Sequence, residues 1–219
     1  MTCRLAIFDC DGTLVDSQAN ICTALEHAFG EAGLMPPPRS VIRRTVGLSL
    51  LEIMRALLPD AGRDVHSEMA EKYRNSYLRL RDQGMEHEPL YDGMADLLGE
   101  LHEGGWMLAV ATGKSDRGLQ RCLDYHGIKG LFVSLQTADR HPSKPHPSMI
   151  HQALADSGVD VAHAVMIGDT VYDIDMGVAA HCRSIGVGWG YHPLEELREA
   201  GADFVVETMD ELKAVLEGM

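Results

Sequence analysis

Residues 5–17 read LAIFDCDGTLVDS, in which an apolar run passes directly into a polar turn. The run Leu5–Phe8 is short and apolar at every position, which is typical of a strand that is buried on both faces of a sheet. It stops at Asp9, and the chain has to turn at Asp11 and Gly12, where glycine permits a tight backbone. The segment therefore predicts an inner strand of a parallel sheet with two carboxylates at its carboxyl end.

Similar apolar runs recur along the chain and alternate with helical patterns. After Pro89, for example, Met94, Leu97, Leu98 and Leu101 follow the spacing of one helix face. Strands that alternate with helices form βαβ units, so we predict an α/β fold with a doubly wound, Rossmann-like parallel sheet. The other expected strands cover residues 108–111, 131–135, 164–167, 184–187 and 204–206.

Residues 16–88 interrupt this alternation, because they contain helical patterns and no strand pattern. A crossover between two neighbouring strands needs far fewer residues than this. We therefore predict an α-helical cap domain inserted at residues 16–88, with an α/β core formed by residues 1–15 and 89–219. The helical patterns within the cap cover residues 17–30, 50–58 and 67–82.

The charge composition argues against some classes of binding partner. The formal net charge is -14 and the pI is near 5.1, whereas nucleic acids and anionic membranes attract basic surfaces. The 5 cysteines lack the paired spacing of a disulfide framework or a zinc site. Because neither a signal-peptide pattern nor a membrane-spanning apolar run is present, we expect a cytoplasmic protein.

Three of the expected strands are followed by polar residues. Asp9 follows the first run, Thr112 follows residues 108–111, and Asp169 comes shortly after residues 164–167. In an open parallel sheet the ligand crevice lies at the carboxyl ends of the strands. One such residue is often only a helix cap, but three together predict a functional site.

The carboxylates near these strand ends require a cation or a shared proton. Asp9, Asp11, Asp169 and Asp173 repel one another at close range unless a positive charge or a shared proton intervenes. Hard oxygen ligands suit Mg²⁺, which also retains waters and a substrate phosphate oxygen. For Asp173, a solvent-facing position on the first turn of a helix is an equal alternative. We expect Asp16 and Ser17 to act only as the N-cap of a helix.

The same residues stand in the order of a known set of motifs. Residues 9–17, DCDGTLVDS, closely resemble the first motif of the haloacid dehalogenase superfamily. Thr112, then Lys144 within SKPHP, then residues 168–173, GDTVYD, follow in the order of the remaining motifs. The resemblance covers the whole chain, including the helical cap, and is greatest to the phosphoglycolate-phosphatase-like branch.

This resemblance implies a Mg²⁺-dependent phosphatase that acts on a small phosphorylated metabolite, with phosphoglycolate as the first candidate. Asp9 would attack phosphorus and form an aspartyl-phosphate, and Asp11 would act as general acid and then as general base. Thr112 and the backbone of Gly113 would donate hydrogen bonds to phosphoryl oxygens. Lys144 would pair with the phosphate and with Asp9.

The resemblance also implies the metal ligands and a recognition role for the cap. In the cap, Arg43, Arg44 and Gly47 are candidates for substrate contacts, although each arginine taken alone suits a solvated helix face better. The metal contacts implied are Asp9, the backbone carbonyl of Asp11, Asp169, and Asp173, which would orient metal-bound waters.

Other functions are compatible with parts of the sequence. A phosphomutase would share Asp9, and Arg43 and Arg44 would suit its second phosphate. A dehalogenase would not need the acid Asp11. A phosphoacceptor receiver or another non-enzymatic binding protein would explain neither the long helical insertion nor the filled catalytic positions. The sequence does not choose between a monomer and a homodimer.

Overall fold

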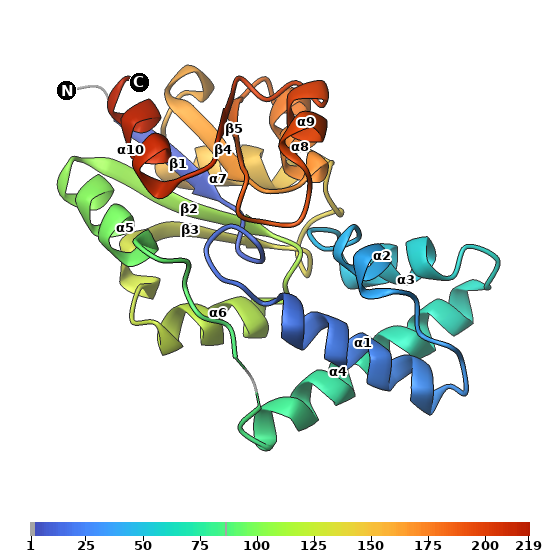
Figure 1. Ribbon diagram of the computed structural model, residues 1–219. Helices are drawn as coiled ribbons and strands as arrows, with labels where there is room; N and C mark the ends of the chain where they lie inside the picture. Colours follow the sequence, from blue (N-terminus) through green and yellow to red (C-terminus); the bar gives the residue numbers. More distant parts are fainter. Residues whose placement is uncertain (1–2, 86) are drawn as a thin grey trace.

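The computed structural model describes residues 3–85 and 87–219, which contain a six-stranded, fully parallel sheet. The strand order is β3-β2-β1-β4-β5-β6, so β1 lies in the middle of the sheet (Figure 1). The predicted α/β Rossmann-like class is therefore confirmed. The strands are β1 (Arg4–Phe8), β2 (Trp106–Thr112), β3 (Phe132–Thr137), β4 (Ala164–Gly168), β5 (Arg183–Val187) and β6 (Phe204–Val206).

The expected strands are all present, and five of the six differ from the expected bounds by one or two residues; β2 and β3 show why. β2 begins at Trp106 instead of Leu108, because Trp106 pairs with Arg4 of β1 and the Arg4 guanidinium lies 4.5 Å from its ring centroid. β3 begins one residue after Leu131, because Leu131 completes a 3-10 turn over Lys129–Leu131. Such short turns are not distinguished from strands by an apolar pattern alone.

Helices cover both faces of the sheet. Side chains alternate along β1, so that Ala6 and Phe8 pack on one helical layer while Leu5 and Ile7 pack on the other. The first layer contains α5 (Met94–Glu103), α6 (Asp116–Tyr125) and α10 (Met209–Glu217). The second contains α7 (Ser148–Ser157) and α8 (Val171–Ala179), and α9 (Leu194–Glu199) packs near β5 and β6.

Four further helices lie together, apart from these layers (Figure 1). Their apolar faces form a separate core that includes Leu25, Phe29 and Met54. The helices are α1 (Gln18–Glu31), α2 (Arg39–Arg43), α3 (Leu50–Leu57) and α4 (Arg63–Asp82). The sequence patterns did not predict the five-residue α2, and they started α4 at Ser67, although the helix begins directly after Gly62.

The two segments that connect these helices to the sheet run side by side. The Asp16 N–H donates to the Pro89 carbonyl at 2.9 Å, and Val15 and Leu90 form an antiparallel bridge. The helical insertion therefore leaves and re-enters the core at one place, near the carboxyl end of β1. Among the described residues, no helix has both the length and the apolar character that a bilayer crossing requires.

Candidate active site

The strand register brings the three expected strand-end residues to one edge of the sheet. Phe8 pairs with Val110 of β2 and with Ile167 of β4, so the chain positions that follow these residues lie side by side. Asp9, Thr112 and Asp169 are each almost completely buried there. The polar ends of β1, β2 and β4 thus converge, as the sequence indicated.

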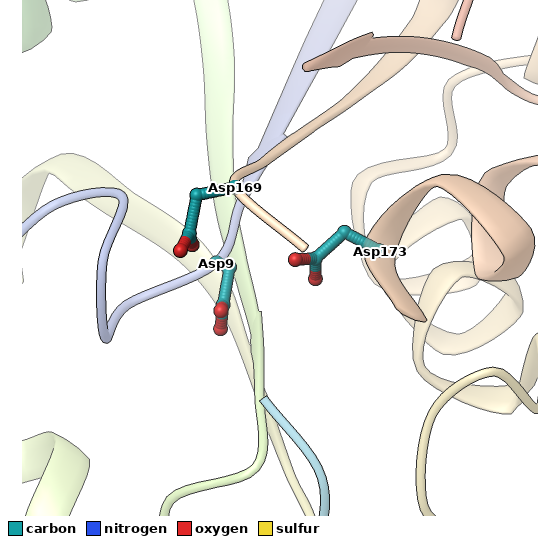
Figure 2. Close-up of side chains that lie close together, drawn as sticks. All are labelled: Asp9, Asp169 and Asp173. Carbon is teal, nitrogen blue, oxygen red and sulfur yellow. The ribbon is translucent and has the colours of Figure 1, made fainter. Parts of the chain in front are cut away.

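Three carboxylates form a buried acidic cluster, composed of Asp9, Asp169 and Asp173. One oxygen of each lies within 4.8 Å of the others, and all three residues are fully buried. Figure 2 shows Asp9 and Asp169 following adjacent strands and Asp173 reaching towards them from α8. The alternative in which Asp173 faces solvent is therefore wrong.

Lys144 lies between two members of the acidic cluster. It is held by the loop between β3 and α7, and its Nζ is 2.8 Å from Asp9 Oδ1 and 2.5 Å from Asp173 Oδ1. Both side chains of each pair are fully shielded from solvent. One ammonium group faces three carboxylates, so the fully ionised cluster retains an excess of negative charge.

The protonation equilibria reflect this excess. Burial raises the pKa of Asp9 to about 7, although the charge of Lys144 acts in the opposite direction, and Asp173 raises it further. Burial, followed by the charges of Asp173 and Asp9, also raises the pKa of Asp169 well above its usual value. An ionised carboxylate in a low-dielectric site is stabilised only by a nearby positive charge. The cluster therefore needs more positive charge than Lys144 supplies.

The side chains of the acidic cluster fit a divalent cation. Neither carboxylate oxygen of Asp9 accepts a hydrogen bond from the described residues, even though Lys144 is close to one of them. Buried polar atoms without a partner are uncommon and indicate an additional binding partner. Three convergent carboxylates are hard oxygen donors, which are the ligands that Mg²⁺ prefers. Asp9, Asp169 and Asp173 are thus the residues suited to hold Mg²⁺.

Several neighbouring groups hold the Asp169 carboxylate in place. Its carboxylate accepts hydrogen bonds from the Thr13 hydroxyl and from the Tyr191 backbone, both at 2.9 Å. Gly12 passes directly over it with a φ of 89°, and a Cβ at this position would lie 2.2 Å from Asp169 Oδ2. The turn after β1 therefore requires glycine both for its backbone conformation and for its closeness to the carboxylate.

Asp11 lies beside the acidic cluster in a different environment. It is 7% exposed, and its carboxylate accepts a hydrogen bond from the Ser17 hydroxyl and contacts Lys114 Nζ at 2.9 Å. Ser17 occupies the N-cap position of α1, but its side chain makes no capping hydrogen bond. The expectation that Ser17 is only an N-cap is therefore wrong, since its hydroxyl is directed to Asp11.

Lys114 is a site residue that the sequence reasoning missed. Besides Asp11, its ammonium contacts Glu88 at 3.1 Å and lies 6.0 Å from the centroid of the Tyr77 ring. Its side chain is 11% exposed, so the contacts form in a largely dry environment. The available signal was its place two residues after Thr112, on a loop that had to approach the same crevice.

The loop after β2 lies directly against the cap. Thr112 Oγ1 accepts a hydrogen bond from the Lys114 backbone at 3.2 Å. At Gly113, a Cβ would lie 2.4 Å from the Leu48 carbonyl oxygen and 2.7 Å from that of Gly47. A larger residue at Gly113 would therefore push the cap away from the core. Gly47, predicted as a substrate contact, is thus brought to the site.

The two predicted cap arginines lie elsewhere. Arg44 forms a two-pronged ion pair with Glu196 of α9 at 2.6 and 3.0 Å, and Arg43 donates to the Gln18 side chain at 3.2 Å. Neither lines the cavity between cap and core. Their contact with substrate stays a prediction from the sequence.

A cavity of about 500 Å³ lies between parts of the cap and the core. Asp11, Gly113 and Lys114 line it from the core, and Gly47 and Tyr77 line it from the cap. Asp11 and Gly113, which lie just after β1 and β2, connect this space with the strand ends. A substrate in the cavity can therefore be enclosed by both parts of the molecule while its reacting end approaches the acidic cluster.

Comparison with known proteins agrees with this arrangement. Residues 6–187 match the haloacid dehalogenase-like hydrolase family. The chain is 33% identical to the probable phosphatase IndB of Dickeya dadantii, covering 95% of this chain and 91% of that protein. It is 30% identical to a phosphoglycolate phosphatase of Vibrio parahaemolyticus, with coverage of 97% and 96%.

A solved structure of another protein has a similar fold. The crystal structure of a predicted phosphatase from Clostridium acetobutylicum superposes with a TM-score of 0.89 and 25% identity, and each chain is covered completely. The family match extends from β1 to the end of β5 and therefore includes the acidic cluster, Lys144 and the helical insertion. The chain belongs to the haloacid dehalogenase-like hydrolase family and is similar there to the phosphoglycolate phosphatases.

Proposed function

We propose that this chain is a magnesium-dependent phosphatase that hydrolyses a small phosphate monoester, such as phosphoglycolate, through an aspartyl-phosphate on Asp9. The observation that carries the proposal is the environment of Asp9. Its carboxylate is fully buried at the end of β1, accepts no hydrogen bond from the described residues, and has Lys144 Nζ at 2.8 Å. The family and its phosphatase members support the class of phosphoric monoester hydrolases.

The reaction divides into two displacements at phosphorus. An Asp9 oxygen attacks phosphorus in line, the bond to the leaving oxygen breaks, and Asp11 gives that oxygen a proton. Asp11 then removes a proton from water, and the water oxygen attacks phosphorus of the aspartyl-phosphate. The bond between phosphorus and the Asp9 oxygen breaks, which releases phosphate and restores the carboxylate.

The remaining groups position the phosphoryl group. Thr112 and the Gly113 backbone are at the end of β2, where a hydroxyl and an N–H can donate to phosphoryl oxygens. Lys144 offsets the negative charge that Asp9 and the phosphoryl group bring together. Mg²⁺ held by Asp9, Asp169 and Asp173 would supply further positive charge for the phosphoryl oxygens.

Ser17 and Lys114 serve Asp11. The hydroxyl of Ser17 and the ammonium of Lys114 both contact the Asp11 carboxylate, so they restrict its orientation beside the strand ends. Asp11 lines the cavity, whereas Asp9 is completely buried. This difference suits an acid and base that exchanges protons with a leaving group and water, next to a nucleophile shielded from bulk solvent.

Substitutions at Asp9 and Asp11 separate the two roles. Asp9→Asn removes the nucleophile, so no phosphoenzyme forms with any substrate. Asp11→Asn leaves the nucleophile, and the first step with an alkyl phosphate should slow roughly 10²–10⁴-fold because its leaving group needs a proton. With an aryl phosphate the first step needs little proton donation, so the phosphoenzyme should accumulate for want of a base.

The experiment is a rapid acid quench with a radiolabelled aryl phosphate. We expect labelled Asp11→Asn protein and unlabelled Asp9→Asn protein. If both variants become labelled, Asp9 is not the nucleophile. If Asp11→Asn turns over at the rate of the unchanged protein, Asp11 is neither the acid nor the base.

A further inference from the structure

The cavity between cap and core has two chemically different ends. Near the strand ends it is lined by Asp11 and Lys114, both of which are largely buried. Four arginines line another part of it, two from α4 of the cap and two from α6 of the core; three of them are exposed, and Arg81 is partly buried. These four residues, the arginine rim, are Arg74, Arg81, Arg117 and Arg121.

Helix geometry explains why the arginine rim is gathered on the cavity. Arg74 and Arg81 are separated by two helical turns on α4, and Arg117 and Arg121 by about one turn on α6. Residues at these separations lie on the same face of a helix. All four line one cavity, so the cap and the core each contribute a pair of arginines to it.

The arginines of the rim differ in whether they have an acidic partner. On α4, Arg74 contacts Glu71 at 3.2 Å and Arg81 contacts Asp82 at 3.1 Å. On α6, Arg117 and Arg121 form no ion pair and no side-chain hydrogen bond with any residue of the described segments 3–85 and 87–219. Two adjacent arginines without an acidic partner can bind a carboxylate or a phosphate.

The acidic residues of the cavity do not cancel this feature. Asp11 and Glu88 both contact Lys114, at 2.9 and 3.1 Å, and so share its charge away from the rim. The third, Asp139, accepts a hydrogen bond from the backbone of Asp116 at 2.9 Å. Among the described residues none of these three carboxylates forms an ion pair with an arginine of the rim, and together with Lys114 the rim gives the cavity five cationic side chains against three acidic ones.

The space between the two ends is apolar and partly aromatic. Ile21, Ile53 and Leu50 line it together with the rings of Tyr73 and Tyr77. A cavity of about 500 Å³ is within the usual size for an organic ligand, and apolar walls with a few polar anchors are typical of such sites. Phosphoglycolate has its carboxylate next to the ester and would leave these walls and the rim without partners.

We propose that the preferred substrate is a phosphate monoester whose leaving group ends in a second anionic group, separated from the ester by an apolar or flat spacer. This proposal rests on the proposed function, because the ester has to react at Asp9. The second anion is a carboxylate or a phosphate, bound by Arg117 and Arg121. Arg74 and Arg81 approach it from the cap, so the same contact favours the closed arrangement of cap and core.

The test uses esters of equal length that differ only at the far end. Hexane-1,6-diol monophosphate has a neutral hydroxyl there, 6-phosphonooxyhexanoate has a carboxylate, and hexane-1,6-diol bisphosphate has a phosphate. Phosphate release should give a kcat/KM about tenfold or more higher for the anionic esters than for the neutral one. Comparing the two anionic esters identifies which source of negative charge the rim prefers.

The double variant Arg117→Gln/Arg121→Gln assigns the effect to the rim. It should remove the preference for the anionic esters and leave kcat/KM for the neutral ester within about twofold, since the reacting groups are untouched. Arg198→Gln, on the exposed surface of α9 outside the cavity, is the matched control and should keep the preference. Raising the ionic strength from about 0.01 M to about 1 M should weaken the preference in the unchanged protein.

The outcomes separate this proposal from the function on which it rests. If all three esters release phosphate with the same kcat/KM, the anionic subsite is wrong and the phosphatase stands. The subsite is also wrong if the double variant keeps the preference. In that case Arg43→Gln tests whether Arg43 of the cap binds the second anion. If no ester releases phosphate and no phosphoenzyme forms on Asp9, the proposed phosphatase fails first.

Discussion

The acidic cluster and the contact between cap and core are built from similar charged groups in opposite surroundings. In the cluster, the side chains of Lys144, Asp9 and Asp173 are fully shielded from solvent. Between cap and core, the side chains of Arg44 and Glu196 are 51% and 33% exposed. The proposed chemistry is therefore placed at buried strand ends, whereas the cap is joined in part by an ion pair that water can reach.

This difference has energetic consequences. Removing one partner of a buried ion pair leaves an uncompensated charge and costs about 3–5 kcal/mol, whereas an exposed pair contributes about 0.2–1 kcal/mol. The strand ends should thus respond strongly to single substitutions, and the exposed cap contacts should respond weakly. A cap that is held weakly can open for substrate and close over it.

The largest effect should come from removal of the metal. Since Lys144 alone does not balance the acidic cluster, a chelator should abolish phosphate release and Mg²⁺ should restore it. Ca²⁺ should support little turnover, because its longer and looser coordination alters the in-line geometry. Full activity in excess chelator would contradict the assignment of the cluster as a metal site.

Lys144→Met should have the next largest effect on turnover. It leaves Asp9 and Asp173 without their shared counter-charge, so we expect kcat to fall by roughly 10³-fold or more. Stability should fall by about 3–5 kcal/mol, measured by urea unfolding. Lys129→Met, which removes an exposed lysine on the core surface, is the control and should change neither value appreciably. An active Lys144→Met protein would show that the buried pairs serve folding alone.

Stability without metal should depend on pH in a defined direction. Burial raises the pKa of Asp9 to about 7 from an ordinary value of 3.8, so ionisation favours the unfolded chain. The contribution of Asp9 is therefore present at low pH and is lost as the pH rises through about 7. Mg²⁺ would bind the ionised form and so offset this loss.

Thermal unfolding measures this effect. The increase in Tm caused by Mg²⁺ should be larger at about pH 8 than at about pH 5.5, by several degrees. Asp9→Asn lacks the titrating carboxylate and should reduce the difference between the two pH values. If Mg²⁺ raised the Tm of the unchanged protein equally at both pH values, Mg²⁺ binding would not be coupled to the ionisation of the acidic cluster.

Ser17→Ala distinguishes a catalytic contact from a helix cap. Because the Ser17 hydroxyl donates to Asp11 and makes no capping hydrogen bond, we expect kcat for an alkyl phosphate to fall about tenfold with less than about 1 kcal/mol lost in stability. Thr208→Ala is the comparison, since Thr208 caps α10 by accepting from the Glu211 N–H at 3.2 Å. It should lose stability and keep its activity. If Ser17→Ala instead lost stability and kept its activity, Ser17 would act as a helix cap.

The sequence predicted the rigid half of the molecule more completely than the cap interface. A strand end is marked by an apolar run that stops at a polar residue, and parallel register then brings Asp9, Thr112 and Asp169 together. No local sequence pattern identifies Lys114, because its contacts with Asp11 and Glu88 depend on how the cap folds back over the core. Long-range contacts of this kind are set by tertiary packing and not by local pattern.

The same limit applies to the cap arginines. Arg43 and Arg44 were chosen because cations in a cap can contact a phosphorylated substrate, and nothing local identifies Glu196 as a partner of Arg44. The arginine rim was not predicted, since Arg74 and Arg117 are far apart in the sequence and meet one cavity only after the cap folds onto the core.

The smallest expected effect is that of Arg44→Gln. If Arg44 serves mainly to join the cap to α9, its removal should cost no more than about 1 kcal/mol of stability, because the pair with Glu196 is half exposed. The Tyr172 hydroxyl donates to the Arg44 carbonyl at 3.1 Å, a contact that the substitution retains. We therefore expect kcat/KM to stay within about twofold for natural and artificial esters alike.

A double-mutant cycle with Glu196→Gln completes the test of Arg44. If the two side chains act only on each other, the double variant should be no less stable than the sum of the single variants predicts, with a coupling of about 0.2–1 kcal/mol. If Arg44 contacts substrate, Arg44→Gln should lower kcat/KM for natural esters while Glu196→Gln leaves it unchanged or raises it by freeing the guanidinium group. Activities on a small aryl phosphate, measured in parallel, separate a lost substrate contact from a displaced cap, because only the displaced cap would change every substrate equally.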